Sequence, residues 1–269
     1  MSGAKDIRLS PISVQDARTF VKRHHYSGKT TSNSQLHLGI FLDGGMVGAM
    51  QFGPSLDKRK LIGLVAGTQW NGFIELNRLA LVNDTPRNTE SRALAIAMRI
   101  IRREYPHIRW VVSFADATQC GDGTIYRAAG FVLTGIKPNK QILDWNGRLI
   151  AKKTLDNLNH PRFGGKYFSR HLLETGQAVP LAGFQLRYLY FLDPTARQQL
   201  TVPEIPFGKI AEMGAGMYKG RPKDSSEPSA IHAGEGGAAP TRTLQNLFPL
   251  RDRMAVSYTH LTLPTKRIV

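Results

Sequence analysis

Residues 73–105, FIELNRLALVNDTPRNTESRALAIAMRIIRREY, form the stretch of sequence that decides the fold. The first part, 73–82, is rich in apolar residues and predicts a strand. After a polar loop, 89–105 repeats apolar residues at helical spacing and predicts the clearest helix of the chain. Pro106 ends this helix, because proline cannot continue one. A strand that leads through a loop into a long helix is typical of a mixed α/β domain.

The segment downstream of this helix predicts a buried strand and then a second, shorter helix. IRWVVSFAD (108–116) is a nearly continuous apolar run, as expected of a central strand that is buried on both faces. The turn ATQCGDG (117–123) leads to a short helix at 124–130 and a further strand at 131–137. Together with the elements upstream, these residues predict a mixed α/β sheet flanked by helices.

The segment upstream predicts a capped helix followed by a hairpin. Ser13 is expected to cap a helix at 13–23. QLHLGIFL (35–42) and MVGAMQFG (46–53) then predict two antiparallel strands joined at a DGG turn. Gly48 inside the second strand predicts a bulge or a close approach of another backbone. The residues expected on the buried face of the helix are Val14, Ala17 and Val21.

Beyond residue 137 the pattern is weaker. Asn146-Gly147 predicts a hairpin turn, and FQLRYLYFL (184–192) predicts a late strand. We expect a domain at 1–213, made of a core (7–137) and a β-containing C-terminal extension (138–213), then a flexible tail (214–255) and an end that resembles a sequencing adapter and is not native (256–269).

The charge of the chain points to a polyanionic partner. The 269 residues carry 36 Lys and Arg against 20 Asp and Glu, a net charge of +16, and the pI is about 10.2. Nucleic acid is the simplest partner for such a surface, since phosphate contacts dominate that kind of binding. The single cysteine, Cys120, fits a reducing cytoplasm. No apolar run approaches the length of a membrane span, so no membrane association is expected.

The segment KRHHYSGK (22–29) combines two histidines with three cations. Neighbouring residues point about 100° apart on a helix and to opposite faces of a strand, so His24 and His25 are not expected to share a metal ion. We expect His25 to face a pocket and to act in catalysis. The residues expected to contact DNA are Lys22, Arg23, Tyr26, Ser27 and Lys29 here, and Lys58, Arg59 and Lys60 at a second exposed turn.

Three motifs resemble the GNAT acyltransferase superfamily: FLDGGMVGAMQFG, ELNRLALVNDTPRNTESRALAIAMRII and TIYRAAGF. The resemblance implies a mostly antiparallel central sheet, a donor pyrophosphate at a helix N-terminus, and a general acid at Tyr126. A tyrosine of the core is the alternative for Tyr126. The superfamily's two glycines at the donor turn are missing, and Glu90 brings an anion there. An ordinary helix capped by Asn88 or Thr89 is therefore the alternative to a donor site. The donor-binding residues that the resemblance implies are Arg78, Arg87, Ser91 and Arg92.

A more specific resemblance, to the Mom family of DNA-modification proteins from Mu-like phages, runs from about residue 12 to 221. It rests on RHHYSGK, FGPSLDKRKLIGLV, IELNRLAL, SFADATQCGDGTIYRAAGFVLTGIK, FQLRYLYFLD and GAGMYKGR. It implies transfer of a carbamoylmethyl group to the exocyclic amine of adenine in double-stranded DNA, which protects phage DNA from host restriction. The adenine must leave the base stack to react. Asp116, directly after a buried strand, is the expected base, and a turn aspartate is the alternative.

The sequence leaves open the identity of the donor and whether a metal takes part in the reaction. A carbamoylmethyl group is attached through a methylene, so simple acyl transfer does not make it. The donor is acetyl-CoA followed by a rearrangement or redox step, or a glycyl donor such as glycyl-tRNA. A metal such as iron would serve a redox step, with His37 or Asp116 joining one histidine of the pair. The other functions that the sequence allows are an acetyltransferase for a protein or small amine, and a basic DNA-binding protein without activity.

Overall fold

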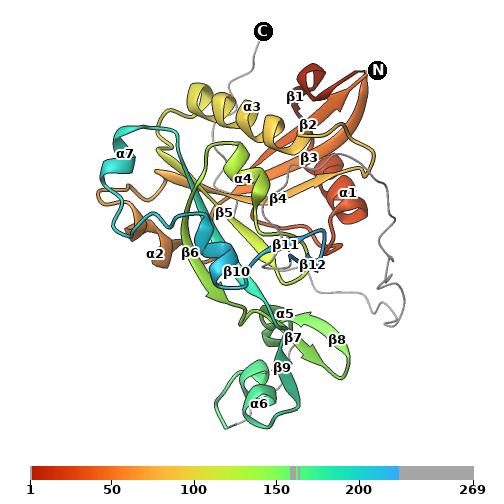
Figure 1. The fold of residues 1–269 in the computed structure, drawn as a ribbon, viewed down its shortest axis with the longest axis vertical. Helices are drawn as coiled ribbons and strands as arrows, with labels where there is room; N and C mark the ends of the chain where they lie inside the picture. The colour runs from red at the N-terminus through yellow and green to blue at the C-terminus, as the bar shows by residue number, and fades with distance from the viewer. Residues whose placement is uncertain (1, 158–161, 163, 224–269) are drawn as a thin grey trace. The chain divides into compact units, whose positions relative to one another are not determined.

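The computed structural model describes residues 2–157, 162 and 164–223. Its main sheet has seven strands in the order β1-β2-β3-β4-β5-β10-β6 (Figure 1). All neighbouring strands are antiparallel except β4 and β5, which confirms the expected mixed and mostly antiparallel α/β fold. The strands are β1 (Arg8–Pro11), β2 (Leu36–Leu42), β3 (Gly45–Gly53), β4 (Phe73–Leu81), β5 (Trp110–Ala117), β6 (Val132–Pro138) and β10 (Phe184–Phe191).

Helices pack on both faces of this sheet. The helices of the core are α1 (Val14–His24), α2 (Lys58–Leu61), α3 (Thr89–Glu104) and α4 (Thr124–Ala128). α3 and α4 pack with one face in the largest hydrophobic cluster. α1 packs on the other face against β3 and β4, and α2 with the 3-10 helix Ile62–Leu64 covers the start of β5. We call this second face, which carries Trp110, Val112, Phe114 and Asp116, the α1 face. None of the helices in the described ranges combines the length and apolarity that a membrane span requires.

The parallel strands β4 and β5 stay together for only three residue pairs. Phe73 pairs with Trp110, and the last pair is Glu75 with Val112. Beyond it, the C-terminal half of β5 is paired with β10 alone in the described sheet. The two central strands therefore separate before Asp116, and this separation exposes the end of β5 where polar residues are found.

Two bulges adjust the strands next to this opening. In β3 the register shifts beside Gly48, and a Cβ atom on Gly48 would lie 3.0 Å from the Ala80 carbonyl oxygen. Both features that the sequence predicted for Gly48 are thus present. In β4 the register shifts at Asn77, which was not predicted. An extra residue reverses the alternation of side chains, so Arg78 lies on the same face as Glu75.

The first helix begins where the sequence predicts. The Ser13 side chain accepts a hydrogen bond from the Asp16 N–H at 3.0 Å, which is N-capping geometry. Ala17 and Val21 are buried as expected, but the expectation for Val14 was wrong, since 41% of its surface is exposed. The residues by which α1 joins the cluster against β3 and β4 are Phe20 and Val21, and Val14 is not part of this cluster.

Replacing Ser13 with alanine should lower the free energy of unfolding by about 1 kcal/mol. The reason is that the Asp16 N–H would lose its partner at the helix end. Urea unfolding followed by circular dichroism measures the change. Ser13→Asp, which keeps an acceptor at this position, serves as the control and should stay close to the wild type. Equal losses in both variants would contradict the capping role.

The residues between β6 and β10 form a small separate cluster. β7 (Ile142–Trp145), β8 (Arg148–Ala151) and β9 (Ala178–Pro180) make a three-stranded sheet, with α5 (Lys152–Asp156) and α6 (Phe168–Glu174) beside it (Figure 1). The β7–β8 turn has positive φ angles of 53° at Asn146 and 73° at Gly147, which confirms the predicted hairpin. β10 lies inside the main sheet, so the extension returns to the core.

The described residues after β10 also pack on the core. They include α7 (Thr195–Gln198), α8 (Gly208–Glu212) and a hairpin of β11 (Met217–Tyr218) and β12 (Arg221–Pro222). The Met217 carbonyl accepts a hydrogen bond from the Asp122 N–H at 3.0 Å, and Lys223 pairs with Asp122 at 2.6 Å. The first ten residues of the expected tail therefore form part of the fold. Residues 224–269, which hold the rest of that tail and the adapter-like end, lie outside the described residues.

Candidate active site

The carboxylate of Asp116 and the hydroxyl of Tyr26 meet at the end of β5. Tyr26 donates to Oδ2 of Asp116 at 3.1 Å, although the two residues are far apart in sequence. Oδ1 accepts hydrogen bonds from Gln185 Nε2 (3.0 Å), from the Thr118 N–H (3.0 Å) and from the Thr118 hydroxyl. The hydrogen bonds from Thr118 form the local turn that is expected if Asp116 is a turn aspartate, the alternative to a base. The other oxygen is directed at Tyr26, so it is the one accessible for chemistry.

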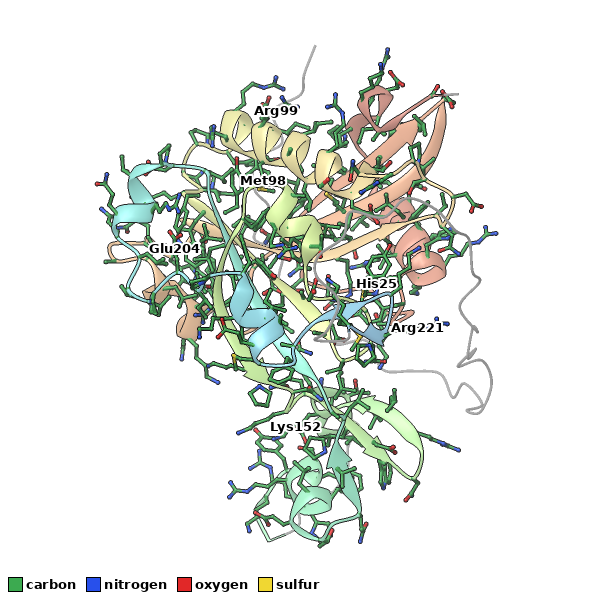
Figure 2. The ribbon with its side chains drawn as sticks, in the orientation of Figure 1. His25, Met98, Arg99, Lys152, Glu204 and Arg221 are labelled. Carbon is green, nitrogen blue, oxygen red and sulfur yellow. The ribbon has the colours of Figure 1, made fainter. Side chains whose placement is uncertain are left out.

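His25 lies beside this pair at the C-terminal end of α1 (Figure 2). Its ring lies tilted against that of Tyr26 with 4.4 Å between centroids, and Nδ1 accepts a hydrogen bond from the Ser27 N–H at 3.2 Å. Nδ1 also bonds the Ser27 hydroxyl at 2.8 Å. Burial, followed by the positive charge of Arg78, lowers the pKa of His25 to about 3. An imidazole whose Nδ1 accepts a backbone proton carries its own proton on Nε2 when neutral.

The two histidines have different neighbours, as the sequence predicts. The ring of His24 packs on Phe20 with 4.4 Å between centroids, while His25 contacts Tyr26 and Ser27. In the described part of the chain, no three His, Cys, Asp or Glu side chains are grouped so that they could hold a metal. His37, the other possible ligand, is buried on β2. Within the described ranges, the side chains that could bind iron are therefore not brought together.

The pKa of His25 predicts a pH dependence of stability. In the folded state the pKa is depressed from 6.5 to about 3, so the unfolded chain binds this proton more readily, and stability falls as the pH drops below 6.5. Between pH 7 and 5 the wild type should lose roughly 1 to 2 kcal/mol more unfolding free energy than His25→Gln. Urea titrations of both proteins at the two pH values measure this difference. Parallel losses would show that His25 protonates freely in the folded protein.

Arg78 reaches the site because of the bulge at Asn77. Its guanidinium donates to the carbonyl oxygens of Lys29 (3.0 Å) and Asn77 (2.6 Å). Its charge also acts on His25, Tyr26 and Glu75. Arg78 therefore lies with the residues expected to contact DNA, and its expected role in donor binding stays a prediction.

Glu75 is a residue of this site that the sequence analysis missed. It is half-buried on β4, and burial raises the pKa of its carboxyl, against hydrogen bonds from Ser55 and Asn77 that lower it. A carboxylate in the middle of the apolar run FIELNRLAL was the available indication. Gln185 was also missed, since only the pairing of β10 with β5 brings it opposite Asp116.

Tyr126 is packed in the core. It is 8% exposed, and its ring centroid lies 5.3 Å from that of Phe131 and 5.2 Å from that of Tyr188. Burial raises its pKa to about 12. No hydrogen bond in the described residues joins Tyr126 to Asp116. The alternative of a core tyrosine describes this packing, and the role of general acid stays a prediction.

The N-terminus of α3 holds the residues expected to bind the donor. Asn88 is the N-cap residue with a left-handed φ of 69°, and its side chain makes no capping hydrogen bond. Ser91 donates to the Asn88 carbonyl oxygen at 3.2 Å, and Arg92 donates to that of Lys5 at 3.0 Å. Arg87 is exposed just before the helix. Ser91 and Arg92 are thus already engaged by the protein's own carbonyl groups, and their donor role stays a prediction.

The thiol of Cys120 is within reach of two carboxylates, that of Asp116 on β5 and that of Glu90 in the first turn of α3. The Cys120 residue is exposed as a whole, and partial burial of its thiol, followed by the charges of Asp116 and Glu90, raises the pKa of the thiol to about 11. A thiol with such a pKa is protonated at neutral pH and is a poor nucleophile.

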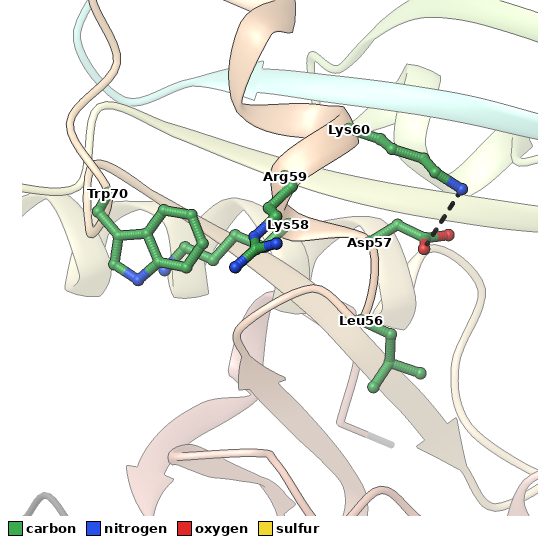
Figure 3. A pocket seen from close by; sticks show the side chains of 6 residues that line it. All are labelled: Leu56, Asp57, Lys58, Arg59, Lys60 and Trp70. Atoms are coloured by element: carbon green, nitrogen blue, oxygen red, sulfur yellow. Dashed lines mark ion pairs between the residues drawn. The ribbon is translucent and has the colours of Figure 1, made fainter.

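The expected phosphate ligands are accessible but fall into two groups. Lys22, Arg23 and Lys29 are exposed around the end of α1. Lys58 lies on α2, which is a short helix rather than the expected turn, with its Nζ 4.7 Å from the centroid of the Trp70 ring (Figure 3). Within the described ranges, no hydrogen bond or ion pair connects the second group to Tyr26 or Asp116. The residues that line a pocket of about 380 Å³ on α2 are Leu56, Asp57, Lys58, Arg59, Lys60 and Trp70.

Fold and site together define a mixed α/β protein with a tyrosine–carboxylate pair at the separation of two central strands. The family model of the Mom protein family matches residues 6–209. The methylcarbamoylase Mom of Escherichia phage Mu is 36% identical over 199 residues, which cover 74% of this chain and 80% of that protein. The chain belongs to the Mom protein family.

Solved structures that are similar to this chain include acetyltransferases. An N-acetyltransferase from Staphylococcus aureus Mu50 has 10% sequence identity and a TM-score of 0.36, over 69% of this chain and 97% of that one. A GNAT family acetyltransferase from Elizabethkingia anophelis, solved with acetyl-CoA bound, has 12% identity and a TM-score of 0.35, over 69% of this chain and 98% of that one.

Proposed function

We propose that this protein transfers a carbamoylmethyl group to the exocyclic amine of adenine in phage DNA, which protects that DNA from restriction in the host cytoplasm. The observation that carries the proposal is the Tyr26–Asp116 pair beside a neutral His25, in a chain of the Mom family. The 36% identical relative is named a methylcarbamoylase. The net charge of +16 agrees with a DNA substrate.

Asp116 is proposed as the group that takes the proton from the amine. The lone pair of the adenine amine is delocalised into the ring, so the amine is a weak nucleophile that needs a base as its new bond to carbon forms. Oδ1 of Asp116 is held by Gln185 and Thr118. Oδ2 then receives the proton in place of the Tyr26 hydroxyl, whose ring is 52% exposed and can line the base.

The atoms of the carbamoylmethyl group are the basis on which we propose the donor. A glycyl group carried by tRNA contains the same atoms as a carbamoylmethyl group, so attack on its carbonyl breaks the ester bond and gives an isomer of the product, which then rearranges. The acetyl group of acetyl-CoA lacks the nitrogen. Tyr126 is proposed to supply a proton to the leaving oxygen. The residues proposed to hold the donor are Arg78, Arg87, Ser91 and Arg92, and no step is assigned to iron.

Mass spectrometry of nucleosides tests this proposal. The protein is produced in bacteria with a plasmid, and the plasmid DNA is digested and compared with DNA from cells without the protein. We expect deoxyadenosine carrying the added mass of a carbamoylmethyl group, labelled when the cells receive labelled glycine. Label from acetate instead would indicate acetyl-CoA. Unmodified DNA with an acetylated protein or small amine would favour the acetyltransferase, and salt-sensitive DNA binding with no modification would favour a protein without activity.

A further inference from the structure

The α1 face of the sheet carries an exposed aromatic ring beside the proposed base. Phe114 is 40% exposed, although it lies on a central strand between the buried residues Ser113 and Ala115. Phe114 and Asp116 are two residues apart on β5, so their side chains point to the same face, about 6.6 Å from each other along the strand. A phenyl ring in this position is left open to solvent directly next to the Asp116 carboxylate.

The neighbouring strands add cations to the same face. In the register of the sheet, Phe114 pairs with Arg187 of β10, which pairs with Gly135 of β6. Asp116 pairs in the same way with Gln185, which pairs with Lys137. Residues directly opposite each other on paired strands share a face. Two adjacent rows therefore bring together Phe114, Asp116, Arg187, Gln185 and Lys137.

Arg187 lies flat on the sheet. A Cβ atom on Gly135 would be 3.5 Å from its Nη2 atom, so the guanidinium extends over this glycine. It donates to the Thr134 hydroxyl (3.0 Å) and to the Thr134 carbonyl oxygen (2.7 Å). The guanidinium therefore lies over β6, and the phenyl ring of Phe114 lies on β5, on the other side of β10 and on the same face of the sheet.

The charge on these two rows is not balanced by the protein. Arg187 is half-buried, burial lowers its pKa, and it forms no ion pair with a described residue. Lys137 is exposed and also without an ion pair in the described part. Asp116 is the carboxylate on these rows, and both of its oxygens accept hydrogen bonds from Tyr26, Gln185 and Thr118. A half-buried cation without a counterion is unfavourable, so a bound anion would stabilise this surface.

The open part of this face is bounded at both ends along the strands. The next row of the sheet, Val132, Leu189 and Val112, is covered by the cluster around α2 and the 3-10 helix that follows it. At the other end of this surface, β6 ends at Pro138 and β10 begins at Phe184. Two rows of side chains with one ring and two cations suit a single base and its phosphates better than the broad apolar patch of a protein interface.

We propose that Phe114, Arg187 and Lys137 form a platform for the target nucleotide. The flipped adenine stacks on Phe114 with its amine directed at Asp116, and the phosphates beside it bind Arg187 and Lys137. This proposal rests on the proposed function, because it takes DNA as the substrate. It assigns base recognition to the sheet itself, in addition to the cations around α1 and α2.

Binding of the full chain to two DNA duplexes tests the platform. One duplex holds a mismatched adenine, which leaves the stack at lower cost than a paired one, and the other is fully paired. We expect the wild type to prefer the mismatched duplex. Phe114→Leu should lose about tenfold of affinity for the mismatched duplex, since the stacking of one base on a ring is lost, with the paired duplex bound within about twofold, because phosphate contacts dominate there. Phe114→Tyr should retain the preference.

Arg187→Gln should weaken binding to both duplexes and reduce the salt dependence. One lost phosphate contact lowers the slope of log affinity against log salt by about 0.9. Two matched controls remove similar groups elsewhere: Leu149→Ala takes an exposed apolar side chain from β8, and Arg102→Gln takes an exposed cation from the end of α3. Both controls should bind both duplexes as the wild type does.

Modification of plasmid DNA in cells separates the failure of the platform from that of the proposed function. If the wild type modifies adenine and Phe114→Leu keeps both the mismatch preference and the wild-type rate, the platform is wrong and the proposed function stands. If the wild type does not modify adenine, the proposed function fails and the platform fails with it. A loss of modification in Phe114→Leu that Phe114→Tyr restores supports both.

Discussion

Asp116→Asn should lower the rate of adenine modification by about 10³-fold. Asparagine keeps the size of the side chain, and its oxygen can still accept the hydrogen bonds of Gln185 and Thr118. It removes the negative charge and the capacity to take a proton, so the amine would have to react without a base. The fraction of modified deoxyadenosine, measured by mass spectrometry at several times after induction, gives the rate.

Asp43→Asn is the matched control for this change. Asp43 is exposed in the β2–β3 turn with a φ of 51°, a conformation that asparagine adopts readily. The control should therefore fold and modify DNA as the wild type does. Asp116→Asn should also keep the unfolding free energy of the wild type within about 1 kcal/mol, since Asp116 is only half-buried. Modification at the wild-type rate in Asp116→Asn would disprove the role of Asp116 as the base.

Trp110→Ala should lower the free energy of unfolding by about 3 to 5 kcal/mol. Trp110 has no exposed surface, stacks on Phe73 with 4.2 Å between ring centroids, and donates its indole N–H to the Thr68 hydroxyl at 3.0 Å. Its removal leaves a cavity under α2 and takes away the donor to the Thr68 hydroxyl, at the pair of residues where β4 and β5 are still joined. Urea unfolding followed by circular dichroism measures the loss.

Trp70→Ala removes the same side chain from the surface. Trp70 is 54% exposed and contacts the ammonium group of Lys58. An exposed contact of this kind contributes about 0.5 to 1 kcal/mol, so the two tryptophan variants should differ by several-fold in their effect. Similar losses of unfolding free energy in both variants would mean that the buried packing of Trp110 does not stabilise the sheet.

The elements of the fold that depend on local sequence could be predicted. The helix at 89–105 follows from apolar residues at helical spacing, and α3 spans Thr89–Glu104. The turns at Asp43-Gly44 and Asn146-Gly147 follow from residues that adopt positive φ, and each joins a hairpin. The short edge strand β1 was missed because its residues, Arg8–Pro11, are mostly exposed and gain their order from pairing with β2.

The sequence selected parts of the candidate site and not their arrangement. Asp116 was selected because it ends a buried strand, and the segment KRHHYSGK because of its composition. Nothing local connects them, since Tyr26 reaches Asp116 only when α1 packs on the sheet. The same holds for Val14, whose exposure depends on where the helix meets β3 and β4.

The sequence by itself determined the helices α1, α3 and α4, two tight turns, the basic charge and the type of each reactive side chain, because these depend on residues close together in the chain. The tertiary structure alone decided which of these side chains share one face. The bulge at Asn77 turns Arg78 towards Glu75, and the pairing of β10 with β5 places Gln185 beside Asp116 and Arg187 beside Phe114. Strand register is set by packing across the whole sheet, and a shift of one residue would move each of these groups to the opposite face.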